Sequence, residues 1–280
     1  PASVLPSSGL DCRRDHPVRH PTERKRIGRS PRKLCRVLSG GETGFRPRKC
    51  PVEVPRASVF GMVVSVNEEL REQTRSAYDA VASDYATIIP DTGFEAPLDL
   101  AMVNEFVSEV AKRPASKVLD AGCGAGRMVT YLQSQSPSLD VVGIDLSAEM
   151  IALAQSAHPT AKFRQADLSD TQFPDGEFDG ILAWYSIIHT EPDQLAEIVA
   201  EFARILRSEG LVLLGYQVGA GERQLNRPYG HDVELRAFLH RTDGVIATLT
   251  NGGFDLIARL DRAPRTSERH AQGFVLARRK

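Results

Sequence analysis

The sequence has few cysteines, a single tryptophan and no long apolar run. Of its 280 residues 4 are Cys, and three of these (Cys12, Cys35 and Cys50) lie before residue 62. Cys123 is the only cysteine after residue 61, so residues 62–280 cannot form an internal disulfide. This is typical of a reducing, cytoplasmic location. The spacing of the cysteines, without a CxxC pair, argues against a zinc site. No stretch reaches the 18 or so apolar residues of a membrane span, so we expect no membrane partner.

The chain also lacks a net charge, because two oppositely charged parts cancel. Residues 1–61 carry 14 Lys and Arg against 5 Asp and Glu, whereas residues 62–280 carry 21 against 31. Eight of the 17 prolines fall in the first part. We expect residues 1–61 to be a basic, Pro/Arg-rich leader, disordered or upstream of the natural start at Met62, and residues 62–280 to form one domain. The acidic balance of that domain argues against nucleic-acid binding.

The composition of the leader bears on three other roles. A secretory signal needs an apolar core of 7 to 15 residues, which the leader lacks. A transit peptide is rich in arginine and poor in acids, as the leader is, but the prolines would interrupt its amphipathic helix. A contact of the basic leader with nucleic acid or an acidic partner stays open.

The apolar pattern predicts an α/β fold. Helical spacing runs from Leu70 to Tyr85 and again from Leu98 to Val110. Strand-like runs then alternate with helical segments, which is typical of a doubly wound, mostly parallel sheet. Two late runs, Phe254–Leu260 and Gly273–Ala277, predict a C-terminal antiparallel hairpin. The expected strands are residues 117–121, 140–145, 161–166, 178–185 and 211–216, and the expected helices are residues 126–135, 148–157, 193–206 and 243–251.

A glycine-rich loop follows the first predicted strand. It reads Asp-Ala-Gly-Cys-Gly-Ala-Gly over residues 120–126, and glycines allow a sharp turn and a close approach to a ligand. An NAD fingerprint would need a third glycine at position 127, where Arg127 stands. A tight turn without a ligand is the structural alternative. Asp145 and Asp167 end the next two predicted strands, so three acids fall on the edge where open α/β sheets bind ligands.

Residues 70–280 resemble a class I S-adenosylmethionine-dependent methyltransferase that acts on small molecules, with a Rossmann-like sheet of seven strands. The resemblance implies that the glycine loop holds the methionine part of the cofactor, that Asp145 binds its ribose, and that Asp167 lies at its adenine. The turn before strand five, at Ser208 and Glu209, departs from the usual Pro-Gly-Gly. The implied cofactor contacts are Tyr78, Tyr85, Asp120, Ala121, Gly122, Gly124, Gly126, Arg127, Asp145, Leu146, Met150, Asp167, Leu168, Ala183 and Trp184.

The residues after the fourth strand are the candidates for the chemistry. His189 suits a general base that removes a proton from a hydroxyl or amine, although a lone histidine is often structural. Tyr185 is a second catalytic candidate. Trp184 either faces the cationic sulfonium or packs against the sheet.

Substrate contacts are expected from the polar segment 216–232, as a lid over the site or as a mobile surface connection. The candidates are Tyr216, Gln217, Tyr229 and His231, and residues 233–239 are expected to add an edge strand over the pocket.

Two absent motifs narrow the reaction. Positions 183–186 read Ala-Trp-Tyr-Ser instead of the Asn/Asp-Pro-Pro-Tyr of DNA and glutamine methyltransferases. No Asp-Asn pair follows strand five, which argues against the metal-dependent catechol type. The sequence therefore predicts metal-independent O- or N-methylation of a small molecule, which converts S-adenosylmethionine to S-adenosylhomocysteine. The alternatives are an NAD-type oxidoreductase and a non-catalytic protein that binds the same cofactor.

Overall fold

The computed structural model describes the backbone from Arg56 to Lys280 and the side chains from residue 68 onward. The first 55 residues of the predicted leader lie outside the described part. A 33-residue helix, α1 (Arg56–Ile88), opens the described part and runs through Met62 without a break. The helix expected at residues 70–85 is its C-terminal half. Contacts group residues 54–280 into one compact unit. The predicted division at residue 62 stays a prediction.

The remaining elements alternate as the sequence predicts. Their bounds, in chain order, are η1 (Thr92–Phe94), α2 (Pro97–Val110), β1 (Lys117–Ala121), α3 (Arg127–Gln135), β2 (Asp140–Asp145), α4 (Ala148–Ala157), β3 (Lys162–Gln165), β4 (Phe178–Trp184), η2 (Ile187–His189), α5 (Leu195–Ile205), β5 (Leu206–Gln217), β6 (Glu222–Asn226), η3 (Pro228–Gly230), β7 (Glu234–Phe238), α6 (Thr242–Asn251), β8 (Phe254–Arg262) and β9 (Gln272–Arg279).

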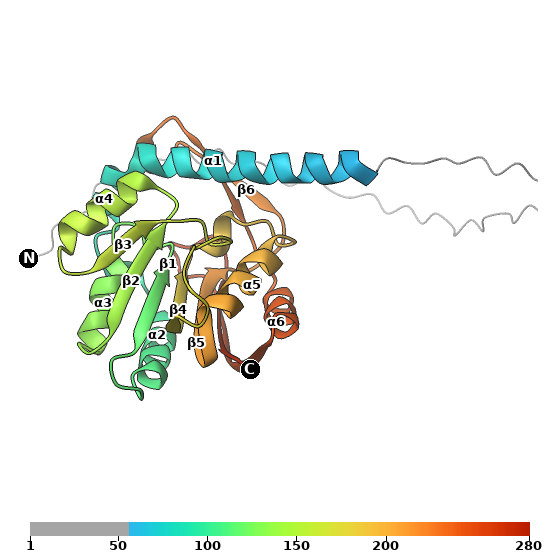
Figure 1. Ribbon diagram of the computed structural model, residues 1–280. Helices are drawn as coiled ribbons and strands as arrows, with labels where there is room; N and C mark the ends of the chain where they lie inside the picture. Colours follow the sequence, from blue (N-terminus) through green and yellow to red (C-terminus); the bar gives the residue numbers. More distant parts are fainter. Residues whose placement is uncertain (1–55) are drawn as a thin grey trace, which may run out of the picture. The chain divides into compact units, whose positions relative to one another are not determined.

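The main sheet has seven strands in the order β3-β2-β1-β4-β5-β9-β8 (Figure 1). Strands β1 to β5 are parallel, and the C-terminal hairpin β8–β9 joins β5 in antiparallel pairing. The predicted fold class is confirmed. From β1 the chain adds β2 and β3 on one side and then returns to add β4 and β5 on the other, so the strand order reverses between β1 and β4. Ligands of open α/β sheets bind at such a point, beyond the carboxyl ends of the strands.

Helices cover both faces of the sheet and bury its apolar side chains. On one face α2 and α3 pack through residues such as Phe106 and Leu132, and on the other α5 and α6 pack through residues such as Phe202 and Leu249. Helix α1 instead crosses the edge where the parallel strands end (Figure 1). It therefore roofs the point where the strand order reverses.

Two predictions about the fifth strand and its sequel need correction. The segment Glu234–Phe238 does not extend the main sheet, because it pairs with β6 as a separate two-stranded sheet. The turn predicted before strand five lies inside β5 as a bulge, since Phe178 pairs with Leu206 while Gly180 pairs with Leu211. Glu209 takes a φ of 64° in this bulge, which supplies the bend that glycine gives elsewhere.

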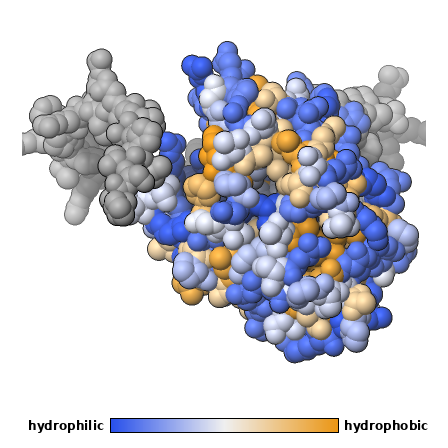
Figure 2. Space-filling model, turned by 90° about the vertical axis from the view of Figure 1, so that its left-hand side faces the viewer, coloured by the Kyte–Doolittle hydropathy of each residue, from blue (hydrophilic) through white to orange (hydrophobic). Residues whose placement is uncertain are grey.

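The surface carries no broad apolar area on the face of Figure 2. Hydrophobic residues there are scattered among hydrophilic ones (Figure 2). Single exposed apolar side chains are normal for a globular protein. Within residues 56–280, no helix has the length and apolar character that a membrane crossing requires.

Candidate active site

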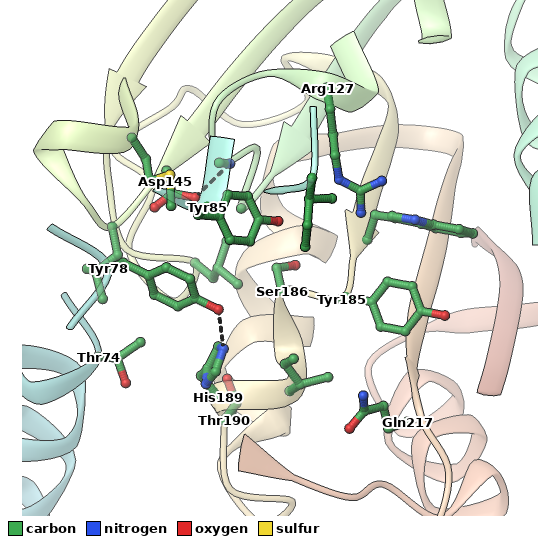
Figure 3. A pocket seen from close by; sticks show the side chains of 18 of the residues that line it. Thr74, Tyr78, Tyr85, Arg127, Asp145, Tyr185, Ser186, His189, Thr190 and Gln217 are labelled. Carbon is green, nitrogen blue, oxygen red and sulfur yellow. Dashed lines mark hydrogen bonds between the residues drawn. The ribbon is translucent and has the colours of Figure 1, made fainter. Parts of the chain in front are cut away.

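A cavity of about 600 Å³ lies between α1 and the carboxyl ends of the parallel strands. Its walls come from α1, the glycine loop after β1, the ends of β2 and β4, and the loop between β8 and β9 (Figure 3). This volume falls within the range of small-molecule and cofactor sites. The sites predicted from widely spaced motifs are thus brought into one cavity.

The glycine loop approaches β4 so closely that side chains cannot fit. Gly122 has a φ of 82°, and a Cβ atom added to it would lie 2.3 Å from Cβ of Ser186. Gly124 has a φ of 52° and faces the ring of Tyr85. Backbone, rather than side chain, therefore forms this wall, as a ligand held by main-chain groups requires. The hydroxyl of Ser186 is buried at the same wall and has no hydrogen-bond partner among the described residues.

Asp145 links the loop to the end of β2. One carboxylate oxygen accepts a hydrogen bond from the Gly124 amide at 2.9 Å, and the other accepts one from the Ser147 amide at 2.9 Å. Burial raises the pKa of Asp145, and the backbone donors oppose that rise. Each oxygen keeps a further lone pair, so the carboxylate can still accept hydroxyl donors from the cavity.

Asp120 lies behind the loop instead of lining the cavity. Its side chain is 1% exposed, and neither carboxylate oxygen has a hydrogen-bond partner in the described part of the chain. Burial raises the pKa of Asp120 to about 7, although nearby Arg127 acts in the opposite direction. A buried carboxylate without donors is costly unless a cation approaches it.

The opposite end of the cavity is lined by the residues predicted to hold an adenine. Leu146, Met150 and Leu168 provide apolar surface there, beside Asp167. Asp167 accepts hydrogen bonds from the backbone and hydroxyl of Ser169, at 2.7 and 2.6 Å. Its second oxygen lies 3.4 Å from Nε of Arg71 on α1.

Tyr78 and His189 form a hydrogen-bonded pair over the middle of the cavity (Figure 3). His189 Nδ1 lies 2.6 Å from the carbonyl oxygen of Arg236, which can only accept, so Nδ1 carries the proton. Nε2 therefore accepts from the Tyr78 hydroxyl, at 2.7 Å. Burial lowers the pKa of His189 to about 4 and raises that of Tyr78 well above its usual value. Both side chains are neutral at pH 7.

A glutamate that no sequence motif revealed completes a third wall. Glu95, just before α2, accepts from Arg127 at 2.5 Å and from the indole nitrogen of Trp184 at 3.1 Å. The ring of Trp184 also stacks on Phe274 with 5.1 Å between centroids. Trp184 therefore both lines the cavity and packs against Phe274 of the sheet, and its contact with the sulfonium stays a prediction.

The cavity is also lined by Tyr185, Gln217 and Tyr229. The rings of Tyr85 and Tyr229 lie edge to face, with 5.2 Å between their centroids. Tyr185 and Tyr229 have φ values of 59° and 54°, which non-glycine residues seldom adopt. Such strained positions are often found at functional sites.

Six predicted contacts do not line the cavity, and Asp120, described above, is one of them. The side chain of Tyr216 is fully buried beneath the sheet beside His240, because strand alternation points it away from Gln217. His231 lies outside, 2.5 Å from Asp84 of α1. Ala121 and Ala183 belong to the core, and Gly126 caps α3. We therefore remove Tyr216 and His231 from the expected substrate contacts.

A protein-family profile described as a methyltransferase domain matches residues 118–210. These residues span β1, the glycine loop and the strands that surround the cavity. Residues 118–210, about a third of the chain, therefore carry a methyltransferase domain, which the sequence resemblance places in class I. Domains of this class take S-adenosylmethionine as cofactor and leave S-adenosylhomocysteine.

Curated relatives of this methyltransferase domain match part of the chain. Phosphoethanolamine N-methyltransferase 1 of Arabidopsis thaliana is 34% identical over 175 residues, which are 61% of this chain and 35% of the relative. A malonyl-[acyl-carrier protein] O-methyltransferase of Enterobacter lignolyticus is 29% identical over 133 residues, or 48% of this chain and 51% of that one. The chain thus spans only a third to a half of the length of these two relatives.

Solved structures share the fold of the methyltransferase domain. The match to a TehB-like SAM-dependent methyltransferase from Corynebacterium glutamicum covers 72% of this chain and 99% of that chain, with a TM-score of 0.52 and 24% identity. The [4+2]-cyclase SpnF covers 74% and 95%, with a TM-score of 0.56 and 16% identity. The fold therefore hosts more than one chemistry, and the activity must be argued from the site.

Proposed function

We propose that this protein transfers the methyl group of S-adenosylmethionine to an oxygen or nitrogen of a small-molecule acceptor, without a metal. The observation that carries the proposal is the neutral Tyr78–His189 pair, which lies in the same cavity as the glycine loop and Asp145. The names of the relatives, a phosphoethanolamine N-methyltransferase and a malonyl-[acyl-carrier protein] O-methyltransferase, support N- and O-acceptors alike. A cytoplasmic location stays a prediction from the sequence.

The residues present fit the cofactor. The backbone of the glycine loop can contact the methionine part of the cofactor, because no side chain stands between them. Asp145 offers lone pairs to the hydroxyl groups of the ribose. Asp120 does not line the cavity, but it places a buried carboxylate without a described partner behind the glycine loop, and its charge would act across the loop on the cofactor's ammonium group. Leu146, Met150 and Leu168 suit the adenine. The bound cofactor supplies a methyl group on a sulfonium that is already activated.

The chain's own contribution is then to align, to exclude water and to move one proton. Helix α1 roofs the cavity and brings Tyr78 and Tyr85 over it. The acceptor's proton can pass to the pair, because His189 Nε2 is the unprotonated nitrogen and the Tyr78 hydroxyl already points at it. Arg236 holds the imidazole in the required tautomer through its carbonyl group.

The low pKa of His189 shapes this proton transfer. A base with a pKa of about 4 removes little of the proton before the methyl group moves, so we expect proton loss to accompany or follow transfer. The compensating advantage is electrostatic. A neutral imidazole and a neutral phenol do not repel the cationic sulfonium, whereas an imidazolium would.

The test compares His189→Gln, Tyr78→Phe and the double variant with the control Tyr131→Phe. The Tyr131 hydroxyl on α3 donates to Asn104 on α2, and Tyr131 does not line the cavity. We expect His189→Gln and Tyr78→Phe each to lower turnover roughly 100-fold and the control to leave it unchanged. The double variant should be no slower than either of these two single variants, because their side chains share one hydrogen bond. The measurement is transfer of labelled methyl from S-adenosylmethionine to a panel of small alcohols, phenols and amines.

Calorimetry with S-adenosylhomocysteine and with NAD provides the binding control. We expect all four variants to bind S-adenosylhomocysteine within a few-fold of the parent. Binding of NAD alone would contradict the proposed function. Full turnover of His189→Gln would leave the cofactor site intact but would remove the pair from the mechanism.

A further inference from the structure

Every cation that the described part of the chain contributes to the cavity is already paired with an acid. Three arginines are involved, and their ion pairs are Arg71–Asp167 at 3.4 Å, Arg127–Glu95 at 2.5 Å and Arg265–Glu268 at 2.8 Å. The histidine of the cavity, His189, is neutral at pH 7. A carboxylate or phosphate of an acceptor would therefore have to displace an acid from one of these pairs.

The acids of the cavity are engaged in the same way. Glu268 also lies 2.7 Å from Arg262, and Glu95 also accepts from the indole nitrogen of Trp184 at 3.1 Å. Among the described lining residues, Asp145 is the one acid without a salt bridge, and two backbone amides hold it where the ribose is expected. A cationic acceptor would therefore meet no unpaired acid outside the expected cofactor site.

One face of α1 leads from the Tyr78–His189 pair to an apolar part of the wall. Tyr78, Tyr85 and Ile89 follow one another at intervals of seven and four residues, which places them on the same side of a helix. The Ile89 amide donates to the Tyr85 carbonyl at 2.8 Å, so the helical spacing continues one residue past the end of α1. All three line the cavity, and Figure 3 shows Tyr78 and Tyr85 pointing into it. The roof thus changes from a hydrogen-bonding residue to an aliphatic one.

Phe94 stands at the mouth of the cavity, because it lines the cavity and is also 55% exposed to solvent. Its carbonyl oxygen accepts a hydrogen bond from Arg265, which ties it to the loop between β8 and β9 on the facing rim. Among the described residues five large apolar side chains are exposed, and three of them, Ile88, Phe94 and Leu98, lie within eleven residues of the chain. Exposed apolar surface that continues into a cavity indicates a ligand that covers it.

We infer that the methyl acceptor is uncharged and carries an apolar group that leaves the cavity over Ile89 and Phe94. The inference rests on the proposed function, because it places the reacting hydroxyl or aromatic amine at the Tyr78–His189 pair. Burial of apolar surface against this wall favours binding in proportion to the area removed from water. A charged acceptor would instead lose hydration without gaining an unpaired partner, which is unfavourable.

The test measures binding of acceptor analogues to the full-length protein saturated with S-adenosylhomocysteine. The probes are 1-butanol, 1-hexanol and 1-octanol, with octanoate, octylamine and octyl phosphate as charged counterparts. Trp184 is the only tryptophan of the chain and lines the cavity, so its fluorescence reports binding there. The variant is Phe94→Ser. The control Leu256→Ser removes an apolar side chain of similar exposure, 47%, from β8, where it does not line the cavity.

We expect 1-octanol to bind at least tenfold more tightly than 1-butanol, because its additional methylene groups leave water against Ile89 and Phe94. Each charged counterpart should bind at least tenfold more weakly than 1-octanol. Phe94→Ser should weaken binding of 1-octanol at least threefold but that of 1-butanol less than twofold, since the shorter chain does not reach the mouth. Leu256→Ser should change neither by more than twofold.

Equal binding of the three alcohols, or binding of a charged counterpart as tight as that of 1-octanol, overturns the inference. An equal response of Phe94→Ser and Leu256→Ser overturns it as well. Calorimetry with S-adenosylhomocysteine on the parent and both variants checks folding and separates this inference from the proposed function. If all three proteins bind S-adenosylhomocysteine but the alcohols fail the test, the acceptor is of another class and the proposed function stands. If the parent does not bind S-adenosylhomocysteine, the proposed function fails, and the inference fails with it.

Discussion

Asp120 is a buried carboxylate whose oxygens have no donor among the described residues, and it gives a prediction at the scale of one residue. Its pKa of about 7 lies above its ordinary value of 3.8, so the folded state binds more protons than the unfolded state between these values. Stability from this group therefore falls as pH rises from about 4 to about 7. We expect Asp120→Asn to remove that loss and to stabilise the free protein by about 1 to 3 kcal/mol at pH 8.

Urea unfolding at pH 5 and pH 8 checks this expectation. The stabilisation by Asp120→Asn should be small at pH 5, where the parent carboxyl is already protonated, and larger at pH 8. We also expect weaker binding of S-adenosylmethionine, because asparagine offers no charge to its ammonium group. An equal effect of the substitution at both pH values would show that Asp120 is ionised throughout and has a partner.

Asp145 carries a second prediction at this scale. We expect Asp145→Ala to weaken S-adenosylmethionine binding by about 1.5 to 3 kcal/mol, the range for lost charge-assisted hydrogen bonds. Part of this loss comes from the Gly124 amide, which would lose its acceptor and release the loop. Asp145→Asn keeps one acceptor oxygen and should lose less. Titration calorimetry measures both variants, and an unchanged affinity of Asp145→Ala would exclude a role at the ribose.

The residues of the cavity were predictable where a motif carried them. The glycine spacing and the acids at strand ends indicated Gly122, Gly124, Asp145 and Asp167, all of which line the cavity. The sequence did not separate Tyr216 from Gln217, because a strand buried on both faces gives no alternation that marks the cavity side. Glu95 belongs to no motif, and Ser186 was considered only within the segment that replaces Asn/Asp-Pro-Pro-Tyr, so only the fold shows that both line the cavity.

At the scale of elements, the loop between β8 and β9 is held by a buried ion network. Arg262 is 8% exposed and lies between Asp99, 1% exposed, and Glu268, 15% exposed. Asp99 lies in the first turn of α2, 163 residues earlier in the chain. This pairing explains why the sequence did not predict the wall formed by residues 263–271, since nothing local relates these charges.

We expect Arg262→Gln to destabilise the protein by about 3 to 5 kcal/mol, because it leaves a buried carboxylate without its partner. The control Arg259→Gln removes an exposed arginine next to Asp243 and Asp261, and should change stability by less than about 1 kcal/mol. Urea unfolding at pH 7 measures both. A small effect of Arg262→Gln would show that the loop does not depend on this network.

The pH dependence offers an independent check on the same network. Hydrogen bonds and charge from Arg262 lower the pKa of Glu268 to about 2, from an ordinary value of 4.5. The folded state thus binds fewer protons between these values, and stability from this group is present above about pH 4.5 and lost as pH falls toward 2. In Arg262→Gln that acid-sensitive part should largely disappear.

The alternation of strands and helices was predictable because buried apolar faces repeat with periods that the sequence shows. A strand at residues 233–239 was predicted and β7 lies there, but its partner β6 was not, because Glu222–Asn226 is mostly polar. His189 Nδ1 donates to Arg236 on β7, and Asp84 on α1 lies 2.5 Å from His231. Only the folded chain shows that this hairpin positions the imidazole and reaches the roof helix.

At the scale of the whole molecule, the near-zero net charge is the sum of a basic segment, residues 1–61, and an acidic one, residues 62–280. Every described residue of the cavity lies at or after Leu70, and the compact unit begins at Val54. We therefore expect a chain that starts at Val54 to bind S-adenosylhomocysteine as tightly as the full chain, within about twofold.

A chain that starts at Ile89 is the matched comparison, because it lacks α1 and with it Tyr78 and Tyr85. It should retain the sheet but bind S-adenosylhomocysteine at least tenfold more weakly, since the roof of the cavity is gone and the cofactor is exposed to water. Calorimetry on the three chains, with circular dichroism to check folding, measures the effect. If the chain that starts at Val54 were as weak as the one that starts at Ile89, the basic segment would belong to the binding unit, and the division of charge would not mark a division of function.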